Sequence, residues 1–237
     1  MMTHKERVTA QIRHQETDFI PYTLGFDART GIEERLDVYF GSPAWRGLID
    51  NAIQSVGAPS AGVSVDGDLV ERSTRTTWTD VYGTRWRLDK RPHELLEPAL
   101  KAPTLAGYEF PSAEACFDPD WEARVRAQIE AHRDCFLVAG FGFGLFERTW
   151  TLRGFENALA DVALHPAFYE ELVERVAEHQ MALIERLLTL PIDGVMFSDD
   201  ISYQHGVLVG PQRWRRLFKP HLARQYQRVH EAGKFVL

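Results

Sequence analysis

Apolar residues recur along the chain with two periods, one typical of helices and one typical of strands. Apolar positions three to four residues apart predict helices over residues 3–14, 30–39, 45–56, 118–129, 155–164, 166–187 and 211–232. Short, almost wholly apolar runs predict strands over residues 18–26, 61–65, 135–141, 193–198 and 234–237. Apolar strands that alternate with helices indicate parallel βαβ units, and hence an α/β fold.

Two local signals refine this pattern. Thr3 followed by Glu6 has the spacing of a capping box for the first helix. The segment 75–89 is rich in Thr, Trp, Tyr and Val, which predicts a β-hairpin, and four prolines lie between it and residue 112. We interpret residues 75–112 as an excursion from a single domain over residues 1–237, because the apolar elements before it are too few to close a core alone.

Two folds with parallel strands are consistent with this pattern, an open doubly wound sheet and a (β/α)8 barrel. The glycines after the third strand, Gly140 and Gly142, are followed by Leu145, which breaks the GxGxxG spacing of a dinucleotide site. This favours an incomplete (β/α)8 TIM barrel with about five of eight strands. Because residues 234–237 begin a strand, we expect the chain to be truncated at its C-terminus.

Composition and charge argue against several classes of protein. With 27 basic and 34 acidic residues the formal charge is −7, which argues against nucleic-acid binding. No apolar run is long enough to predict a membrane span. The two cysteines, Cys116 and Cys135, have no CxxC spacing, and no secretory signal precedes them. We therefore expect a cytoplasmic protein that acts on a small molecule.

Polar residues gather where the predicted strands end. In a barrel the carboxyl ends of the strands form one mouth, where catalytic groups lie. This rule selects Asp66, Asp199 and Asp200 as candidate catalytic residues. The candidate substrate-binding residues are Gly140, Phe141, Gly142, Glu147, Tyr203 and His205.

The adjacent Asp199 and Asp200 have two interpretations. Neighbouring residues on a strand face opposite ways, so at most one carboxylate points into the mouth, where it could transfer a proton or orient a ligand. Alternatively, one caps the next turn and the other faces solvent. No His/Cys cluster has zinc spacing, so no metal site is predicted within this chain.

Several segments resemble the uroporphyrinogen decarboxylase family in its broad sense, which includes corrinoid-linked methyltransferases. They are KERVTAQIRHQETDFIPY, TDVYGTRW, EPALKAPTLAGYEFPSAE, GLFERTWTLRGFENALADV and the segment from IDGVMFSDDISYQHG to the C-terminus. They occur in order and cover most of the chain. The resemblance implies a (β/α)8 barrel in which the strand beginning KFVL continues into a His-x-Cys-Gly stretch, followed by three further strands.

The first strand separates the branches of this family. Decarboxylases carry an Arg-Gln-Ala-Gly-Arg-Tyr type motif there, but this chain has YTLGFDAR at residues 22–29, which lacks the paired arginines. The resemblance therefore implies a methyltransferase that moves a methyl group between a corrinoid or other methylated donor and a thiol or folate-type acceptor. It also implies a corrinoid protein partner, and zinc held by ligands beyond Leu237. The alternatives are a porphyrinogen carboxy-lyase of tetrapyrrole biosynthesis and a non-catalytic barrel that binds a ligand or a corrinoid protein.

Overall fold

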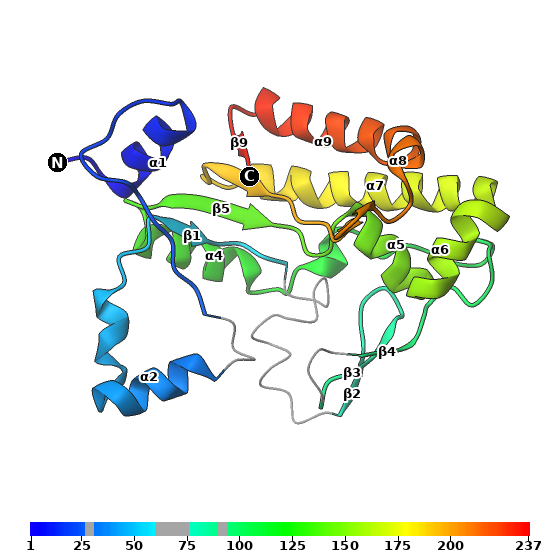
Figure 1. Cartoon of the computed structure of the whole chain (residues 1–237), viewed down its shortest axis with the longest axis horizontal. Coiled ribbons are helices and arrows are strands. Elements are labelled where there is room, and N and C mark those ends of the chain that lie inside the picture. The colour runs from blue at the N-terminus through cyan, green and yellow to red at the C-terminus, as the bar shows by residue number, and fades with distance from the viewer. Residues whose placement is uncertain (27–30, 60–75, 90–93) are drawn as a thin grey trace.

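A parallel β-sheet forms the centre of the protein, which is described here by a computed structural model over residues 1–26, 31–59, 76–89 and 94–237. Its strands are β1 (Ile53–Ser55), β5 (Phe136–Gly140), β6 (Gly194–Met196) and β9 (Phe235–Val236), in that spatial order (Figure 1). All three pairings are parallel. Each of these strands is therefore added beside the previous one, and the sheet grows in a single direction.

Helices connect these strands and cover one face of the sheet. The helical elements are α1 (His4–Ile12), α2 (Ile32–Phe40), η2 (Pro43–Leu48), η3 (Glu114–Cys116), α4 (Trp121–Ala131), α5 (Leu145–Arg153), α6 (Phe155–Leu164), α7 (Pro166–Leu188), α8 (Pro211–Leu217) and α9 (Lys219–Glu231). Leu137, Ala139 and Val195 belong to one large buried cluster with Val125 of α4 and Val229 of α9. We call this helix-covered side the outer face, and the opposite side the inner face.

Among the described residues, a small buried cluster lies on the inner face toward the amino ends of the strands. There Phe136, Val138 and Ala52 pack with Val8 of α1. The backbone N–H of Lys5 donates to Asp134 O, just before β5. Helix α1 thus covers the amino ends of the strands, and its predicted capping box, Thr3 with Glu6, is confirmed.

A second, antiparallel sheet lies in the predicted excursion. It consists of β2 (Thr77–Thr79), β3 (Arg85–Arg87) and β4 (Glu94–Glu97), which confirms the hairpin predicted over residues 75–89. A further two-stranded hairpin is formed by β7 (Ser202–Tyr203) and β8 (Gly206–Val207). The Leu100 N–H donates to Leu152 O, and the Thr84 hydroxyl donates to Thr151 O, so the excursion is anchored on α5.

Two elements near the N-terminus differ from the sequence-based expectation. Residues 18–26 form no strand, although they run beside the start of β1: Tyr22 O accepts from Ala52 N–H, whereas Leu24 N–H donates to the Asn51 side chain. Some backbone N–H groups there bond to side chains instead of to the backbone of the neighbouring segment, and Pro21 has no N–H to donate. No regular strand pairing therefore forms. The helix predicted over residues 45–56 was also wrong, because the helical part ends at Leu48 and β1 begins at Ile53.

Three further differences concern the later elements. The parallel sheet has four strands among the described residues rather than five, and the strand predicted over residues 61–65 lies outside them. Helix α5 was not predicted. The single helix expected over residues 211–232 is divided at Phe218, because Pro220 cannot donate the backbone hydrogen bond that a continuous helix requires. Within the described segments, none of the helices combines the length and apolar character needed to cross a membrane.

Candidate functional site

The candidate site lies at the carboxyl ends of β5 and β6. These strands are parallel neighbours, and Gly140 at the end of β5 pairs with Met196 at the end of β6. The chain leaves β5 through a glycine-rich loop into α5, and it leaves β6 through Ser198 to Ile201. Parallel pairing therefore brings residues more than fifty positions apart to one edge, as the sequence predicted.

Asp199 accepts two backbone hydrogen bonds from the first turn of α5. Its Oδ2 accepts from Phe146 N–H at 2.8 Å, and its Oδ1 accepts from Glu147 N–H at 2.9 Å. These N–H groups have no partner within the helix, and a carboxylate also interacts favourably with the positive end of the helix dipole. Asp199 is thus an N-terminal cap for α5 supplied by a distant loop, with both carboxylate oxygens engaged.

Glycine is required where this loop and helix meet. A Cβ placed on Gly144 would overlap the Ser198 carbonyl oxygen and the Asp199 side chain. Gly142 has a φ of +95°, a conformation that side chains disfavour. By contrast, a Cβ on Gly140 would meet only Met196 atoms, at 3.7 and 3.8 Å. Gly144 therefore permits the close approach of two chain segments.

Burial dominates the ionisation of Asp199. It raises the pKa of this carboxyl to about 6, although the N–H groups of Phe146 and Glu147 act in the opposite direction. Burial also raises the pKa of Glu147, whose Oε2 accepts from Gly144 N–H at 3.2 Å, and the nearby charges of Asp199 and Asp200 add to this effect. Three carboxyl groups therefore share this edge, and two of them hold their protons more tightly than ordinary carboxyls do.

A pH-dependent stability follows from Asp199. Since its folded pKa of about 6 exceeds the usual 3.8, its contribution is fully present below about pH 4 and is lost as the pH rises to about 6. We expect the free energy of unfolding of the wild type, minus that of Asp199→Asn, to fall over this interval and to level off above about pH 7. Urea unfolding at a series of pH values measures this difference. A difference that grows with pH would mean that the two N–H donors outweigh burial.

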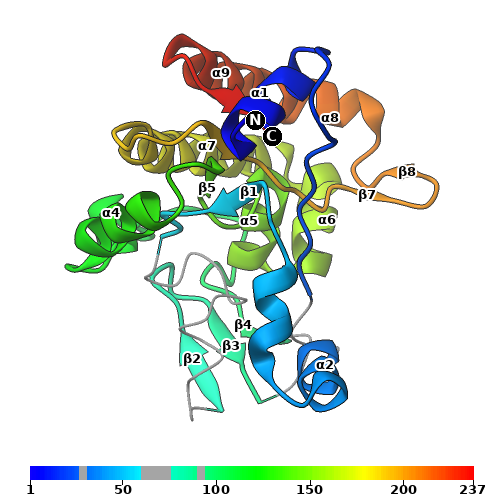
Figure 2. The same cartoon turned by 90° about the vertical axis from the view of Figure 1, so that its left-hand side faces the viewer.

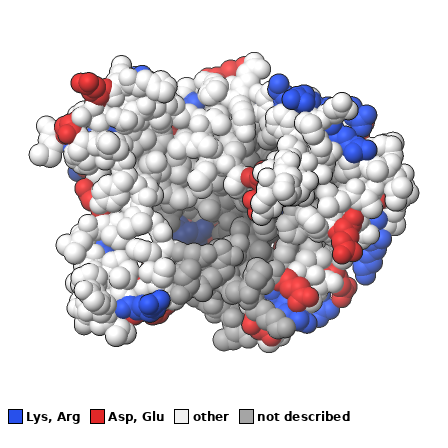
Figure 3. Space-filling view, in the orientation of Figure 1, with Lys and Arg blue, Asp and Glu red and all other residues white. Residues whose placement is uncertain are grey.

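Asp200 faces away from the core. Along β6 and the following loop, Val195 is buried, while Met196, Ser198 and Asp200 are exposed. Asp200 is thus exposed, like Met196 at the end of β6. Figure 3 shows a hollow in the middle of this view of the molecule. Of the two adjacent aspartates, Asp199 supports α5 and Asp200 is free to meet a ligand.

The other predicted site residues lie in a hairpin, in the core or outside the described residues. Tyr203 and His205 belong to the β7–β8 hairpin, which projects from the body of the protein (Figure 2). Both side chains are exposed, and their rings are 5.7 Å apart. Phe141 is buried in the outer core, with its ring 5.0 Å from that of Phe197. Asp66 lies outside the described residues.

Sequence reasoning missed a buried polar network beneath the site. Asp80 Oδ1 accepts from the N–H groups of Tyr82 and Thr84, and Oδ2 accepts from Trp86 Nε1. The buried Arg148 guanidinium lies 4.0 Å from Asp80 and stacks over the Tyr82 ring. TDVYGTRW and Arg148 of α5 are separated in the chain by η3 and α4, and a single sequence does not reveal that they meet.

Tyr82 extends this network to α7. Its hydroxyl is 2.9 Å from His179 Nε2, and Cys116 Sγ lies 3.9 Å from both groups. Burial lowers the pKa of His179 to about 4, so this imidazole is neutral at pH 7. Burial also raises the pKa of the Cys116 thiol, which makes it a poor nucleophile. The cluster is therefore suited to holding the excursion in place rather than to catalysis.

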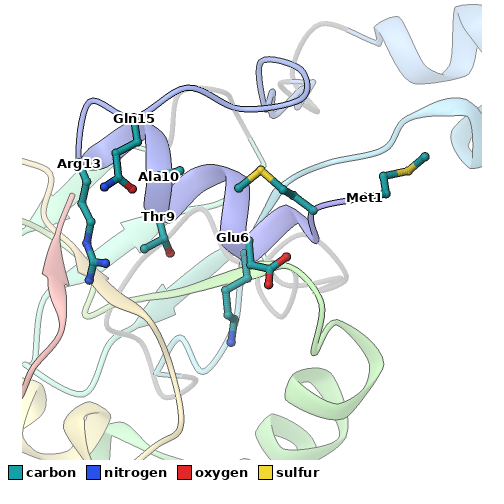
Figure 4. Close-up of a pocket in the computed structure, with 8 residues that line it drawn as sticks. Met1, Glu6, Thr9, Ala10, Arg13 and Gln15 are labelled. Atoms are coloured by element: carbon teal, nitrogen blue, oxygen red, sulfur yellow. The ribbon is translucent and has the colours of Figure 1, made fainter.

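An open groove of about 490 Å³ runs along α1, lined by Met1, Glu6, Thr9, Ala10, Arg13 and Gln15 among others (Figure 4). It lies beside the helix that covers the amino ends of the strands, on the side opposite the candidate site. In the segments that the structure describes, no three His, Cys, Asp or Glu side chains are grouped so that they could hold a metal ion. The carboxyl groups of Asp199, Asp200 and Glu147 therefore form no such site.

Comparison with known proteins gives a similarity in fold. No protein-family model and no curated protein sequence matches this chain. The fold is similar to that of a methyltransferase from Methanosarcina mazei, with a TM-score of 0.57 and 15% sequence identity. The match covers 100% of this chain and 69% of that protein. The α/β fold described above is thus one that a methyltransferase also uses.

Proposed function

We propose that this chain is a methyltransferase-type enzyme whose reaction takes place at the carboxyl ends of β5 and β6. The observation that carries the proposal is the exposed carboxylate of Asp200, beside Glu147, at this edge of a fold shared over the whole chain with a methyltransferase. Asp200 would orient the methyl donor or acceptor. Glu147, with its raised pKa, would take up the proton that a thiol or similar acceptor releases.

We further propose that the sheet is part of a (β/α)8 barrel. Its four parallel strands follow one another in sequence order, whereas a doubly wound sheet reverses direction. Helices cover the outer face, and α1 covers the amino ends of the strands. In a barrel of this kind the inner face at the carboxyl ends, where Asp200 lies, is the reaction site.

Porphyrinogen decarboxylation fits this site less well than methyl transfer. Asp199 would have to accept from the substrate's pyrrole N–H groups, but both of its oxygens already accept from α5. A substrate that carries many carboxylates would also approach an edge with three acidic side chains, where like charges repel. These two features favour a neutral or cationic methyl donor over a polycarboxylate.

The proposal includes zinc and a corrinoid, but residues other than those described here would hold them. The described residues contain no cluster of three metal ligands, so their proposed role is to orient the methyl donor and the acceptor. A zinc-bound thiol, where present, would supply the nucleophile. A corrinoid protein would then dock at the mouth, close to the exposed Ser198 and Asp200.

A methyl-transfer assay tests the proposal. The protein is incubated with methylcobalamin and a thiol such as homocysteine, and demethylation of the corrinoid is followed by absorbance. We expect Asp200→Asn and Glu147→Gln each to lower the rate by about 10- to 100-fold, as is typical when a positioned acid–base group is removed. The exposed Glu171→Gln on α7 is the matched control and should retain the wild-type rate.

The results of this assay distinguish methyl transfer from ligand binding without catalysis and from decarboxylation. Equal rates for the wild type and both mouth variants would place the chemistry elsewhere. A wild type that binds methylcobalamin or a corrinoid protein without demethylation would support the non-catalytic barrel instead. Loss of a carboxylate from a porphyrinogen, measured as released CO2, would overturn the proposal in favour of decarboxylation.

A further inference from the structure

A second cavity lies behind the sheet, on its outer face. It has a volume of about 250 Å³ and is enclosed by the loop after β6 and by helices α5, α7, α8 and α9. Phe141, Phe197, Trp214 and Tyr226 contribute aromatic side chains to its wall. This volume exceeds the ~150 Å³ of an apolar cavity that can hold benzene. We call this space the outer pocket.

Among the residues that the structure describes, one fully buried side-chain atom in the wall of the outer pocket lacks a hydrogen-bond partner. Gln225 is fully buried, and its Oε1 accepts no hydrogen bond from any described residue. The orientation of this amide is fixed, because its Nε2 lies 3.3 Å from Ala177 O and 3.3 Å from Gln180 Oε1, which are both acceptors. A flipped amide would set oxygen against oxygen. Gln225 lines the outer pocket, and its Oε1 is a buried acceptor that remains unpaired.

Gln180 and Asp199, which also line the outer pocket, are already engaged. Gln180 donates from Nε2 to Phe143 O at 3.0 Å and accepts from Gln225, so both ends of its amide are used. Asp199 accepts from the first turn of α5 with both oxygens. Leaving a buried acceptor unpaired costs about 1–3 kcal/mol. Gln225 Oε1 is consequently the position at which a ligand donor would gain most.

We propose that the outer pocket binds a small, flat, apolar ring that carries one N–H or O–H donor. The aromatic wall suits the faces and edges of such a ring, since aromatic pairs favour stacked and edge-to-face contacts. The donor pairs with Gln225 Oε1. Two amides then connect the ligand to the backbone of Phe143, in the glycine-rich loop at the mouth, so that this loop would sense whether the pocket is filled.

The pair indole and indene tests this proposal, because the two molecules have nearly the same shape and only indole has an N–H. Both are titrated into the full chain and followed by ligand-observed NMR. We expect indole to bind with a dissociation constant of about 1 mM or tighter, and indene to bind about five- to tenfold more weakly. Gln225→Met keeps the volume but removes the acceptor, and it should abolish the preference for indole.

Two further measurements keep the test decisive. Ile201→Trp, in the loop that lines the pocket, should fill the space and block both molecules, with the fold checked by circular dichroism. Asp200→Asn should bind indole normally, which separates this site from the proposed catalytic mouth. Equal binding of indole and indene, no binding by the wild type, or a crystal structure after indole soaking with only a water at Gln225 Oε1 would each overturn the proposal.

Discussion

Gly144→Ala is expected to destabilise the protein by about 3 kcal/mol, because the new methyl group has no space. Its Cβ would overlap the Ser198 carbonyl oxygen and the Asp199 side chain, and neither can move freely. The Ser198 oxygen is part of the backbone, and Asp199 is held by two N–H groups of α5. The loop after β6 would have to retreat and release its cap. Urea unfolding measures the loss.

Gly140→Ala, four residues earlier at the end of β5, is the matched control. A Cβ at this position meets Met196 atoms at ordinary contact distances, so we expect a change within about 0.5 kcal/mol. A similar cost for both substitutions would indicate that flexibility, rather than close approach, explains the glycines. Gly144→Ala with wild-type stability would show that the two segments are farther apart than described here.

The same contact matters for the proposed function. Asp199 fixes the loop that carries Asp200, and Gly144 allows Asp199 to reach α5. Displacement of this loop would move Asp200 relative to Glu147, and small displacements of positioned groups reduce catalytic rates strongly. We therefore regard Asp199 and Gly144 as positioning residues, and Asp200 and Glu147 as the groups that meet the substrate.

The sequence predicted correctly those helices and hairpins that are determined by residues close together in the chain. The capping box of Thr3 and Glu6, the hairpin around Asp80 to Gly83 and the long α7 were predicted correctly, because each depends on residues a few positions apart. Strands β5 and β6 were found from their apolar runs. The rule that catalytic groups lie at the carboxyl ends of parallel strands then selected the edge where β5 and β6 end, which is the candidate site.

Helix α5 shows why other elements were missed. Its residues are buried on most sides, among them Leu145, Thr149 and Leu152, so it lacks the periodic polar face that identifies a helix. Its first turn is capped by Asp199, more than fifty residues later in the chain. A determinant at that separation leaves no local pattern. For β1, the apolar residues from Trp45 to Val56 have helical spacing, and only pairing with β5 selects the strand.

The choice between Asp199 and Asp200 also needed the tertiary structure. Sequence reasoning established that only one of them can face the mouth. The structure shows that Asp199 is half-buried and caps α5, whereas Asp200 is exposed. Gln180 and Gln225 were not considered from sequence, since a glutamine on a helix is usually solvated and their mutual contact spans 45 positions.

Asp80→Ala is expected to cost about 3–5 kcal/mol, because it removes the centre of a buried network. Its carboxylate accepts from Tyr82 N–H, Thr84 N–H and Trp86 Nε1–H, and it faces the buried guanidinium of Arg148. After the substitution, three donors and a buried positive charge lose an acceptor. Chemical denaturation followed by tryptophan fluorescence would measure the change.

Arg85→Ala on the same sheet is the matched control. The ion pair of Arg85 with Glu97 is 3.0 Å long and exposed, so its loss should cost less than about 1 kcal/mol. Combining Arg148→Met with Asp80→Ala should cost less than the sum of the two single substitutions, because the interaction between Asp80 and Arg148 is then lost only once. If the two substitutions instead proved additive, the Asp80–Arg148 interaction would be negligible. The excursion would then be held mainly by the backbone contacts of Asp80 and by the packing of Tyr82 and Trp86.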